Sequence, residues 1–372
     1  MKFLAKRSEN IPLKLILFVN YIFILLLLLA YLSLFIDPSV FPYLALLGIA
    51  YLPLLLTNIL FILFWLYFSP LRSIYSIVTI AIGWSILLSH FQFNKKQDST
   101  PESLKIITYN VHNFYNYLPD KNHPNSQQDS IQIFFQKESP DIVCLQEFFP
   151  KDKILINDKK RFGRKIGLKY FHYKKYLSQK HKAKVGLVTY SKYPILKEDF
   201  IEYQHKTIGL ITKILRGKDT IAIYNLHLAS LHFGGNDYRF LKDIKKNQSK
   251  EEIKEGSSRI IHKMLNAYRI RAHETALIKG LLKQTQLPII LCGDFNDTPL
   301  SYTYHEFSEL LEDSFCEAGR GIASTFTAPY LPPIRIDYIL HTKEFKTTNF
   351  KLKKIEFSDH YPIISNMQIG TD

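Results

Sequence analysis

Charged side chains are nearly missing from the first quarter of this 372-residue chain. Between Lys14 and Arg72 the single charged residue is Asp37, and no charged residue lies between Arg72 and Lys95. A helix that crosses a bilayer core needs about 20 apolar residues. The sequence supplies three such runs, at roughly residues 15–36, 40–68 and 74–91. Because a cleaved signal peptide has a shorter apolar region and no following spans, we expect three transmembrane helices within residues 1–92.

The distribution of lysine and arginine around these runs predicts their orientation, because such residues concentrate in cytoplasmic segments. Four precede the first run, namely Lys2, Lys6, Arg7 and Lys14, and Arg72 separates the second run from the third. Lys95 and Lys96 favour the opposite orientation. On balance we predict a multi-pass protein, integral to the cytoplasmic membrane if the source is bacterial, with everything beyond residue 95 on the non-cytoplasmic side.

Cysteine is also scarce. An odd number of three cysteines excludes complete pairing, and no Cys-x-x-Cys spacing points to a zinc or dithiol site. Cys144 and Cys292 lie in apolar, strand-like runs, where cysteine acts as a small hydrophobic residue. The chain also lacks internal repeats and low-complexity segments.

The remaining residues are basic and alternate between strand-like and helix-like patterns. The formal net charge of +15 suits a polyanionic or phosphate-bearing partner, or an anionic membrane surface, without choosing among them. Strands interspersed with helices predict an α/β domain, and their number favours two packed sheets. We therefore expect a membrane anchor over residues 1–92, a polar linker over 93–103 and one α/β domain over 104–370.

Strands are expected at residues 105–111, 141–147, 184–195, 207–215, 220–228, 288–293, 324–327, 335–341 and 360–369. Helices are expected at 130–137 and 251–284, the latter because its apolar residues recur at helical spacing. A lysine-rich segment with Lys242, Lys245, Lys246 and Lys250 precedes the long helix. We interpret it as a solvated surface excursion, with a substrate-facing loop as the alternative.

Several of the expected strands end in polar residues suited to phosphate or metal chemistry. They are Asn110, Gln146-Glu147, Asn225 and His227, Asp294 and Asn296, Asp337, and Asp359-His360. Taken singly, each could be a turn residue. Asp337 has apolar neighbours on both sides, and a buried aspartate needs a partner. His360 is the candidate for that partner.

Taken together and in order, these motifs resemble those of the endonuclease/exonuclease/phosphatase superfamily. The resemblance covers about residues 103–370. It implies a four-layer α/β sandwich, in which two packed mixed sheets are flanked by helices. It also implies Mg²⁺- or Mn²⁺-dependent cleavage of a phosphate ester.

The resemblance also implies roles for individual residues. Glu147 would be the main metal ligand, with Asp359 near the metal and Asn110 supporting it. Asp294 would orient or deprotonate the attacking water, and Asn296 would hold that water or a phosphate oxygen. His360, kept cationic by Asp337, would contact the phosphate, and His227 would act on the leaving-group side.

Two segments differ from those of abasic-site endonucleases. Two residues after Asn110, where those enzymes have a metal-binding aspartate, the chain has His112. The segment from Asn225 to Leu228 resembles sphingomyelinase-like members more closely. Both features disfavour DNA repair.

Three functions remain open from the sequence. The first is a phosphodiesterase acting on nucleic acid, and the second acts on a phospholipid headgroup or a small phosphorylated molecule. The third is a binding module without turnover. A calcineurin-type phosphoesterase fits Gly293–Asp297 but lacks the Asp-x-His and Gly-Asn-His segments that it needs. The sequence gives no basis for predicting a protein partner.

Overall fold

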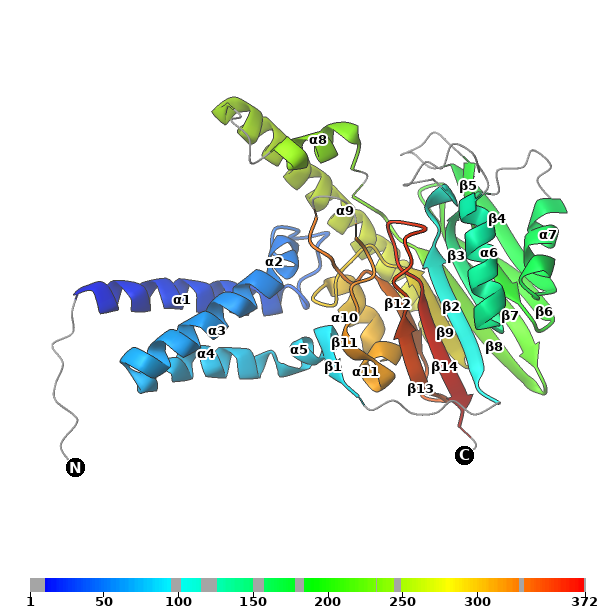
Figure 1. Cartoon of the computed structure of the whole chain (residues 1–372), viewed down its shortest axis with the longest axis horizontal. Helices are drawn as coiled ribbons and strands as arrows, with labels where there is room; N and C mark the ends of the chain where they lie inside the picture. Colours follow the sequence, from blue (N-terminus) through cyan, green and yellow to red (C-terminus); the bar gives the residue numbers. More distant parts are fainter. Residues whose placement is uncertain are drawn as a thin grey trace.

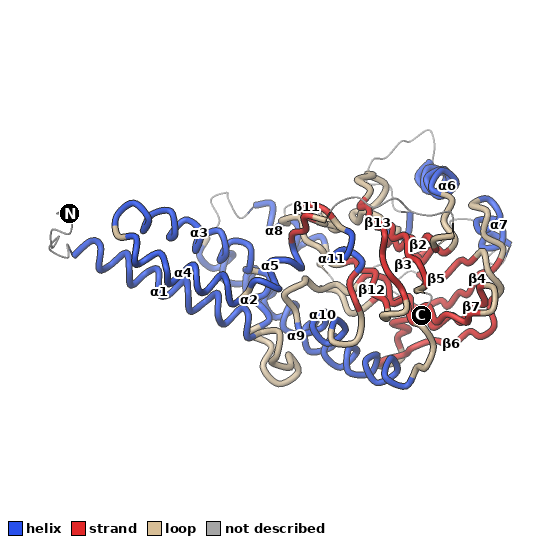
Figure 2. The backbone as a smooth tube through the Cα atoms, turned by 90° about the horizontal axis from the view of Figure 1, so that it is seen from below, coloured by secondary structure: helices blue, strands red, loops and turns tan. Residues whose placement is uncertain are grey.

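The computed structural model describes residues 11–94, 102–114, 126–149, 157–177, 184–231, 233–243, 249–327 and 331–370. A bundle of N-terminal helices forms one end of the molecule, and a two-sheet α/β domain forms the other (Figure 1). Seen from below, the helices of the bundle run side by side toward the sheets (Figure 2).

Two six-stranded mixed sheets make up the centre of the domain. The first contains β2 (Leu104–Asn110), β3 (Ile142–Phe148), β4 (Tyr170–Leu177), β5 (Lys184–Ser191), β13 (Phe345–Leu352) and β14 (Ile363–Ile369). The second contains β6 (Ile195–Tyr203), β7 (Lys206–Arg216), β8 (Asp219–His227), β9 (Ile289–Asp294), β10 (Glu312–Asp313) and β12 (Asp337–His341). Their strand orders are β13-β14-β2-β3-β5-β4 and β10-β12-β9-β8-β7-β6.

Successive apolar residues of one strand enter different cores, because side chains alternate across a sheet. Ile106 and Ile290 belong to the core between the two sheets, which also contains Cys144 and Cys292. Their neighbours Ile107 and Leu291 belong to the cores on the two outer faces. These strands are therefore buried on both faces, by the other sheet on one side and by helices on the other. Both cysteines are buried, as expected.

Helices cover both outer faces. The helices α6 (Ser126–Glu138) and α7 (Asn157–Lys165) pack on the first sheet through Phe135 and Phe162. The helices α9 (Lys250–Gln284) and α10 (Tyr302–Ser308) pack on the second through Ile278 and Phe307. Two short helices, α8 (Gly235–Asp243) and α11 (Ser314–Ala318), and the 3₁₀ turn η1 (His112–Phe114) complete the domain. The predicted four-layer α/β/β/α arrangement is confirmed.

The N-terminal segment differs in detail from the prediction. Its helices are α1 (Ile11–Leu32), α2 (Ala45–Ile49), α3 (Tyr51–Phe68), α4 (Pro70–Ile82) and α5 (Trp84–His90). Among the described residues, α1 and α3 are each long and apolar enough to span a membrane. The helices α4 and α5 meet at a 64° bend and make a third candidate only if the pair counts as one span. The predicted second run is divided into α2 and α3, so two spans are supported directly, and not clearly three.

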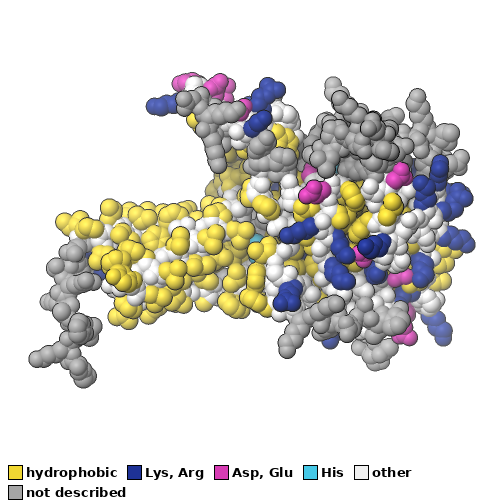
Figure 3. All heavy atoms as spheres, in the orientation of Figure 1, with side chains coloured by type: hydrophobic (Ala, Val, Ile, Leu, Met, Phe, Trp, Pro, Cys, Tyr) yellow, Lys and Arg dark blue, Asp and Glu magenta, His cyan; other side chains and the backbone are white. Residues whose placement is uncertain are grey.

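This bundle is apolar outside and contains a cluster of hydrogen-bonded polar side chains inside. Leu15, Leu60 and Ile82 are more than half exposed, and the outer surface of the bundle is almost entirely hydrophobic (Figure 3). Inside, Asn20 donates from Nδ2 to Ser76 Oγ at 2.9 Å and accepts from Trp65 Nε1 at 2.9 Å. Interhelical hydrogen bonds beneath an apolar surface are typical of helices that pack within lipid.

The bundle docks on the α/β domain through backbone pairing and one buried arginine. The strand β1 (Phe91–Phe93), which crosses the predicted boundary between anchor and linker, pairs antiparallel with β11 (Arg320–Ile322). Arg335 donates to the Ser89 carbonyl at 3.0 Å and to both carboxylate oxygens of Asp313 at 2.7 and 2.5 Å. The guanidinium also lies over the Phe315 and Tyr338 rings. Arg335 therefore joins α5 to the segment that leads into β12.

Other predicted elements need correction. The segment 324–327 is not a strand, since only Phe326 makes isolated bridges there, to Ile334 and His360. The strand predicted from residue 335 begins at Asp337. The segment predicted as one strand over 184–195 contains the whole of β5 and the first residue of β6. Lys242 lies in α8 and Lys250 in α9, whereas Lys245 and Lys246 lie outside the described residues. The strands β4, β6 and β13 were not predicted.

The Arg335 contacts predict a large loss of stability in Arg335→Met. The substitution leaves a buried Asp313 charge without its cation, which costs about 3–5 kcal/mol, or roughly 10 °C in apparent melting temperature. Thermal unfolding of the full chain in detergent measures it. The control is Lys197→Met, which removes an exposed pair with Asp199 and should change stability by no more than about 0.5 kcal/mol. Equal shifts in the two variants would contradict the prediction.

Candidate active site

The polar residues singled out in the sequence converge at one edge of the two sheets. The strands β2 and β3 are parallel and pair Asn110 with Gln146, while β8 and β9 are parallel and pair His227 with Asp294. Their carboxyl ends therefore meet at the same edge. Because β12 and β14 run antiparallel to β9 and β2, their amino ends reach that edge too. The topology thus brings residues from six strands together.

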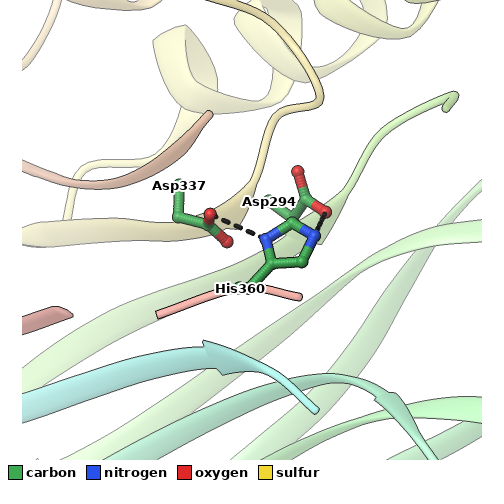
Figure 4. Close-up of side chains that lie close together, drawn as sticks. All are labelled: Asp294, Asp337 and His360. Carbon is green, nitrogen blue, oxygen red and sulfur yellow. Dashed lines mark hydrogen bonds and ion pairs between the residues drawn. The ribbon is translucent and has the colours of Figure 1, made fainter. Parts of the chain in front are cut away.

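A buried trio lies at the centre of this edge. His360 Nδ1 lies 2.9 Å from Asp337 Oδ2, and His360 Nε2 lies 3.7 Å from Asp294 Oδ2 (Figure 4). Burial lowers the pKa of His360, but the carboxylates of Asp337 and Asp294 outweigh it and raise that pKa to about 10. The imidazole is therefore a cation held between two carboxylates, and Asp337 has the histidine partner that the sequence predicted.

The carboxylate of Asp294 is held from several directions. Asn110 Nδ2 donates to Oδ2 at 3.0 Å, and the backbone N–H of Asn296 donates to Oδ1 at 2.8 Å. Burial raises the pKa of Asp294 to about 7 against the opposing charge of His360. A carboxylate with such a pKa can exchange a proton near neutral pH.

The backbone around Asp294 requires a glycine. Gly293 has φ +134°, and a Cβ there would lie 2.1 Å from the carbonyl oxygen of Leu226. Asn296 follows with φ +54° and donates from Nδ2 to the Leu228 carbonyl at 3.1 Å. The strand end predicted from Gly-Asp-Phe-Asn is therefore confirmed. In addition, the Asn296 side chain holds the loop after β8 through its hydrogen bond.

His227 lies beside the trio. Its Nε2 is 3.7 Å from Glu147 Oε1 and 3.8 Å from Asp294 Oδ2. Its Nδ1 is 2.7 Å from the hydroxyl of Tyr176. Burial raises the pKa of Tyr176 well above its usual range, so this hydroxyl stays protonated. Sequence reasoning missed Tyr176, because nothing in its strand marks it as a histidine partner.

The predicted metal ligands face the same cavity. Glu147 has φ +48° where the β3–β5 register shifts, a geometry that re-aims a side chain. Asp359 Oδ1 accepts from Ser358 Oγ at 3.2 Å and lies 3.1 Å from His112 Nδ1. Asn110 Oδ1 accepts from the His112 backbone N–H at 3.0 Å. Glu147, Asp359 and Asn110 therefore bring two carboxylates and an amide to one cavity, and oxygen donors are the ligands that hard divalent cations prefer.

Not every residue of the sequence motifs reaches the cavity. Gln146 Nε2 donates to Thr108 Oγ1 at 3.0 Å and to Asn225 Oδ1 at 2.7 Å. Asn225 Nδ2 donates to the Val188 carbonyl at 3.0 Å. These two buried amides therefore link the sheets behind the site.

A buried network of charged side chains on α9 holds the loops that follow His227 and Asp294. Arg271 on α9 donates from Nε to Asp297 Oδ2 at 3.1 Å and from Nη1 to the Ala229 carbonyl at 2.8 Å. Glu274 Oε2 accepts from the Ala229 backbone N–H at 2.8 Å. The network holds α9 against the loops that follow His227 and Asp294. The sequence indicated an α9 helix but not these pairings.

Glu274 predicts a pH dependence of stability. Burial raises its pKa from 4.5 to about 7, so the folded state binds this proton more tightly than the unfolded state. Its contribution to stability is complete below about pH 4.5 and is lost as the pH rises to about 7. Glu274→Gln should therefore gain stability relative to the unsubstituted protein between pH 5 and 8, by up to about 3 kcal/mol. Melting temperatures measured across that range test it, and a constant difference would contradict it.

Comparisons with known proteins find two family models and several similar solved structures. The residues 13–90 match a family model described as a domain of unknown function (DUF8431). No curated protein matches the sequence. Three similar solved structures have TM-scores of 0.47, 0.49 and 0.47 and are 18%, 14% and 16% identical. They are an endonuclease/exonuclease/phosphatase family protein from Leptotrichia buccalis, the human Nocturnin catalytic domain with bound sulfate, and humanized D. rerio TDP2.

These structures cover 72%, 73% and 72% of this chain and 100%, 97% and 99% of their own chains. The family assignment rests instead on a sequence model that spans most of the chain. Residues 107–360 match the model described as the Endonuclease/Exonuclease/phosphatase family. The chain therefore belongs to the endonuclease/exonuclease/phosphatase family and is a hydrolase of phosphate esters.

Proposed function

We propose that this protein is a membrane-anchored, Mg²⁺- or Mn²⁺-dependent phosphodiesterase. One observation carries the proposal: Asp294, His227, Glu147, Asp359 and His360 line a single cavity, and Asp337 pairs with His360 behind it. The cavity thus combines a candidate base, a cation for a phosphate oxygen and oxygen donors for a metal. This combination serves the hydrolysis of a phosphate ester.

Asp294 is the group that acts on the attacking water. Its raised pKa lets it accept the water proton near neutral pH. The amide of Asn110 and the backbone N–H of Asn296 fix its two oxygens. Water adds to phosphorus, the bond from phosphorus to one ester oxygen breaks, and that oxygen takes a proton.

The two histidines act on the phosphate. His360 remains cationic because Asp337 accepts from its Nδ1, and its Nε2 side faces Asp294 and the cavity. A fixed cation there stabilises the negative charge that develops on the phosphate oxygens. When the Tyr176 hydroxyl donates to Nδ1 of His227, the ring proton lies on Nε2, from which it can reach the leaving oxygen.

Glu147, Asp359 and Asn110 are the proposed metal-binding residues. A bound Mg²⁺ or Mn²⁺ supplies Lewis-acid polarisation of the phosphate. His112, which stands where abasic-site enzymes have an aspartate, contacts Asp359 directly. It therefore orients one proposed metal-binding carboxylate instead of adding another.

The N-terminal helices are the proposed anchor. The described helix α1 begins at the end far from the α/β domain and finishes close to it, α3 runs away, and the α4–α5 pair returns (Figure 1). This path supports an odd number of crossings, with the N-terminus and the site on opposite sides. We infer that the site faces the non-cytoplasmic side, as the lysine and arginine distribution suggests.

The roles of Asp294 and His360 predict a large loss of activity when either is removed. The full chain in detergent should hydrolyse bis-p-nitrophenyl phosphate with Mg²⁺ or Mn²⁺ and lose this activity with chelator. Asp294→Ala and His360→Ala should each lower the rate by at least about 100-fold, while Lys197→Ala should not change it. The proposal fails if the chain shows no metal-dependent turnover, or if both site variants keep the full rate.

The orientation has its own test. Alkaline phosphatase fused after the C-terminus becomes active only outside the cytoplasm, so the fusion should be active in intact bacterial cells. A fusion at Arg72, between the expected second and third spans, should be inactive and serves as the matched control. An inactive C-terminal fusion with an active fusion at Arg72 would reverse the orientation.

A further inference from the structure

The cavity over the candidate site has two chemically different walls. It encloses about 240 Å³. The proposed catalytic and metal-binding residues form one wall. Much of the remaining lining is apolar, and we call it the apolar wall; it includes Ile49, Leu241, Ile260, Met264, Leu331 and Ile334. A phosphate group needs only the polar wall, so the apolar wall indicates that the substrate also carries an apolar group.

The apolar wall is formed by an arm of the domain and by the membrane anchor. Leu241 belongs to α8, and Ile260 and Met264 belong to the N-terminal half of α9, which projects toward α2 and away from the sheets (Figure 1). Ile49 is the last residue of α2. We call the space between this arm and Ile49 the vestibule.

The vestibule lies at the domain-facing end of the anchor. A Cβ on Gly48 would lie 2.4 Å from the Leu300 carbonyl oxygen, so α2 lies directly against the loop after Asp294. Leu300 itself packs in the hydrophobic cluster of the anchor with Leu27 and Tyr51. Apolar packing therefore continues from the helices of the anchor to the loop that follows Asp294. In a bilayer this end of the helices lies at the level of the lipid headgroups.

The charges around the cavity disfavour a nucleic acid. Among the described residues that line it, none is lysine or arginine. Proteins that bind nucleic acid neutralise successive phosphates with such residues. In the space-filling view, Lys and Arg side chains lie across the α/β domain and at the tip of the α8–α9 arm, and the anchor shows almost none (Figure 3). The lysine and arginine side chains that the structure describes are therefore not concentrated in the cavity.

We propose that the substrate is a membrane lipid that carries a phosphodiester. Its phosphate lies against His360, His227 and Asp294, and the adjoining apolar chain lies in the vestibule between Ile49 and the α8–α9 arm. This inference rests on the proposed phosphodiesterase function and specifies its substrate class. Water adds to phosphorus, one phosphorus–oxygen ester bond breaks, and the products are an alcohol and a phosphate monoester.

A series of soluble esters tests the role of the vestibule. The probes are methyl, butyl and octyl p-nitrophenyl phosphate, which share one leaving group and differ in the apolar chain. Since each buried methylene adds favourable transfer free energy, kcat/KM should rise by at least about 10-fold from methyl to octyl. Turnover without any rise would overturn the lipid proposal while leaving the phosphodiesterase function intact. Absence of turnover on all three probes would instead contradict the proposed function.

Variants of the apolar wall sharpen the test. Met264→Gln and Leu241→Gln should each reduce the ratio of octyl to methyl kcat/KM several-fold. The control is Ile261→Gln, because Ile261 is the neighbour of a wall residue on α9 but is exposed and outside the cavity. The control should keep the ratio. Unchanged ratios in both wall variants would overturn the assignment of the vestibule.

A final comparison separates lipid in a bilayer from other sources of phosphodiester. The full chain is reconstituted in vesicles of equal parts phosphatidylcholine and phosphatidylglycerol, and water-soluble products are measured beside cleavage of plasmid DNA. Release of a headgroup or a phosphorylated headgroup from the vesicles, without DNA cleavage, supports the proposal. DNA cleavage without lipid hydrolysis overturns it in favour of a nuclease.

Discussion

The buried carboxylate of Asp294 is the group on which the arrangement of the site depends. It receives a hydrogen bond from Asn110 of the first sheet, lies close to His227 and His360, and continues into the loop of Asn296. Burial makes a lone carboxylate costly, and hydrogen bonds with a neighbouring cation offset that cost. The two sheets must therefore meet in one register for this group to be tolerated. The same constraint leaves it with a pKa near neutrality.

Two other buried ion pairs connect this centre to the rest of the molecule. Arg271, paired with Asp297, holds the long helix α9 beneath the site. Arg335, paired with Asp313, donates to the Ser89 carbonyl and so holds the anchor beside β12. Removing one partner from such a pair leaves a buried charge, so each pair specifies a particular packing. The anchor and the α8–α9 arm thus have defined positions around the cavity. That placement makes the apolar wall part of the site.

The strands that the sequence predicted and the strands that it missed differ in how deeply they are buried. The strands β2, β3, β8 and β9 are apolar on both faces, because helices cover each sheet, and their patterns were readily seen. The strand β6 alternates with charged residues, and β13 contains lysine and asparagine, so neither has the apolar run of a buried strand. Residues 324–327 show the reverse error: an extended, partly apolar segment that makes only isolated bridges.

Within the site, the sequence identified groups that follow a strand and missed groups that arrive from elsewhere. Asp294, His227 and Asp337 belong to motifs at strand ends, and their convergence follows from the strand directions. Tyr176, Arg271 and Met264 belong to no motif, since they reach the site only through the packing of β4 and α9. The family and its proposed chemistry were thus readable from local sequence patterns. Only the tertiary structure brought the apolar arm and Ile49 over the site, because contacts between distant segments depend on how whole elements pack.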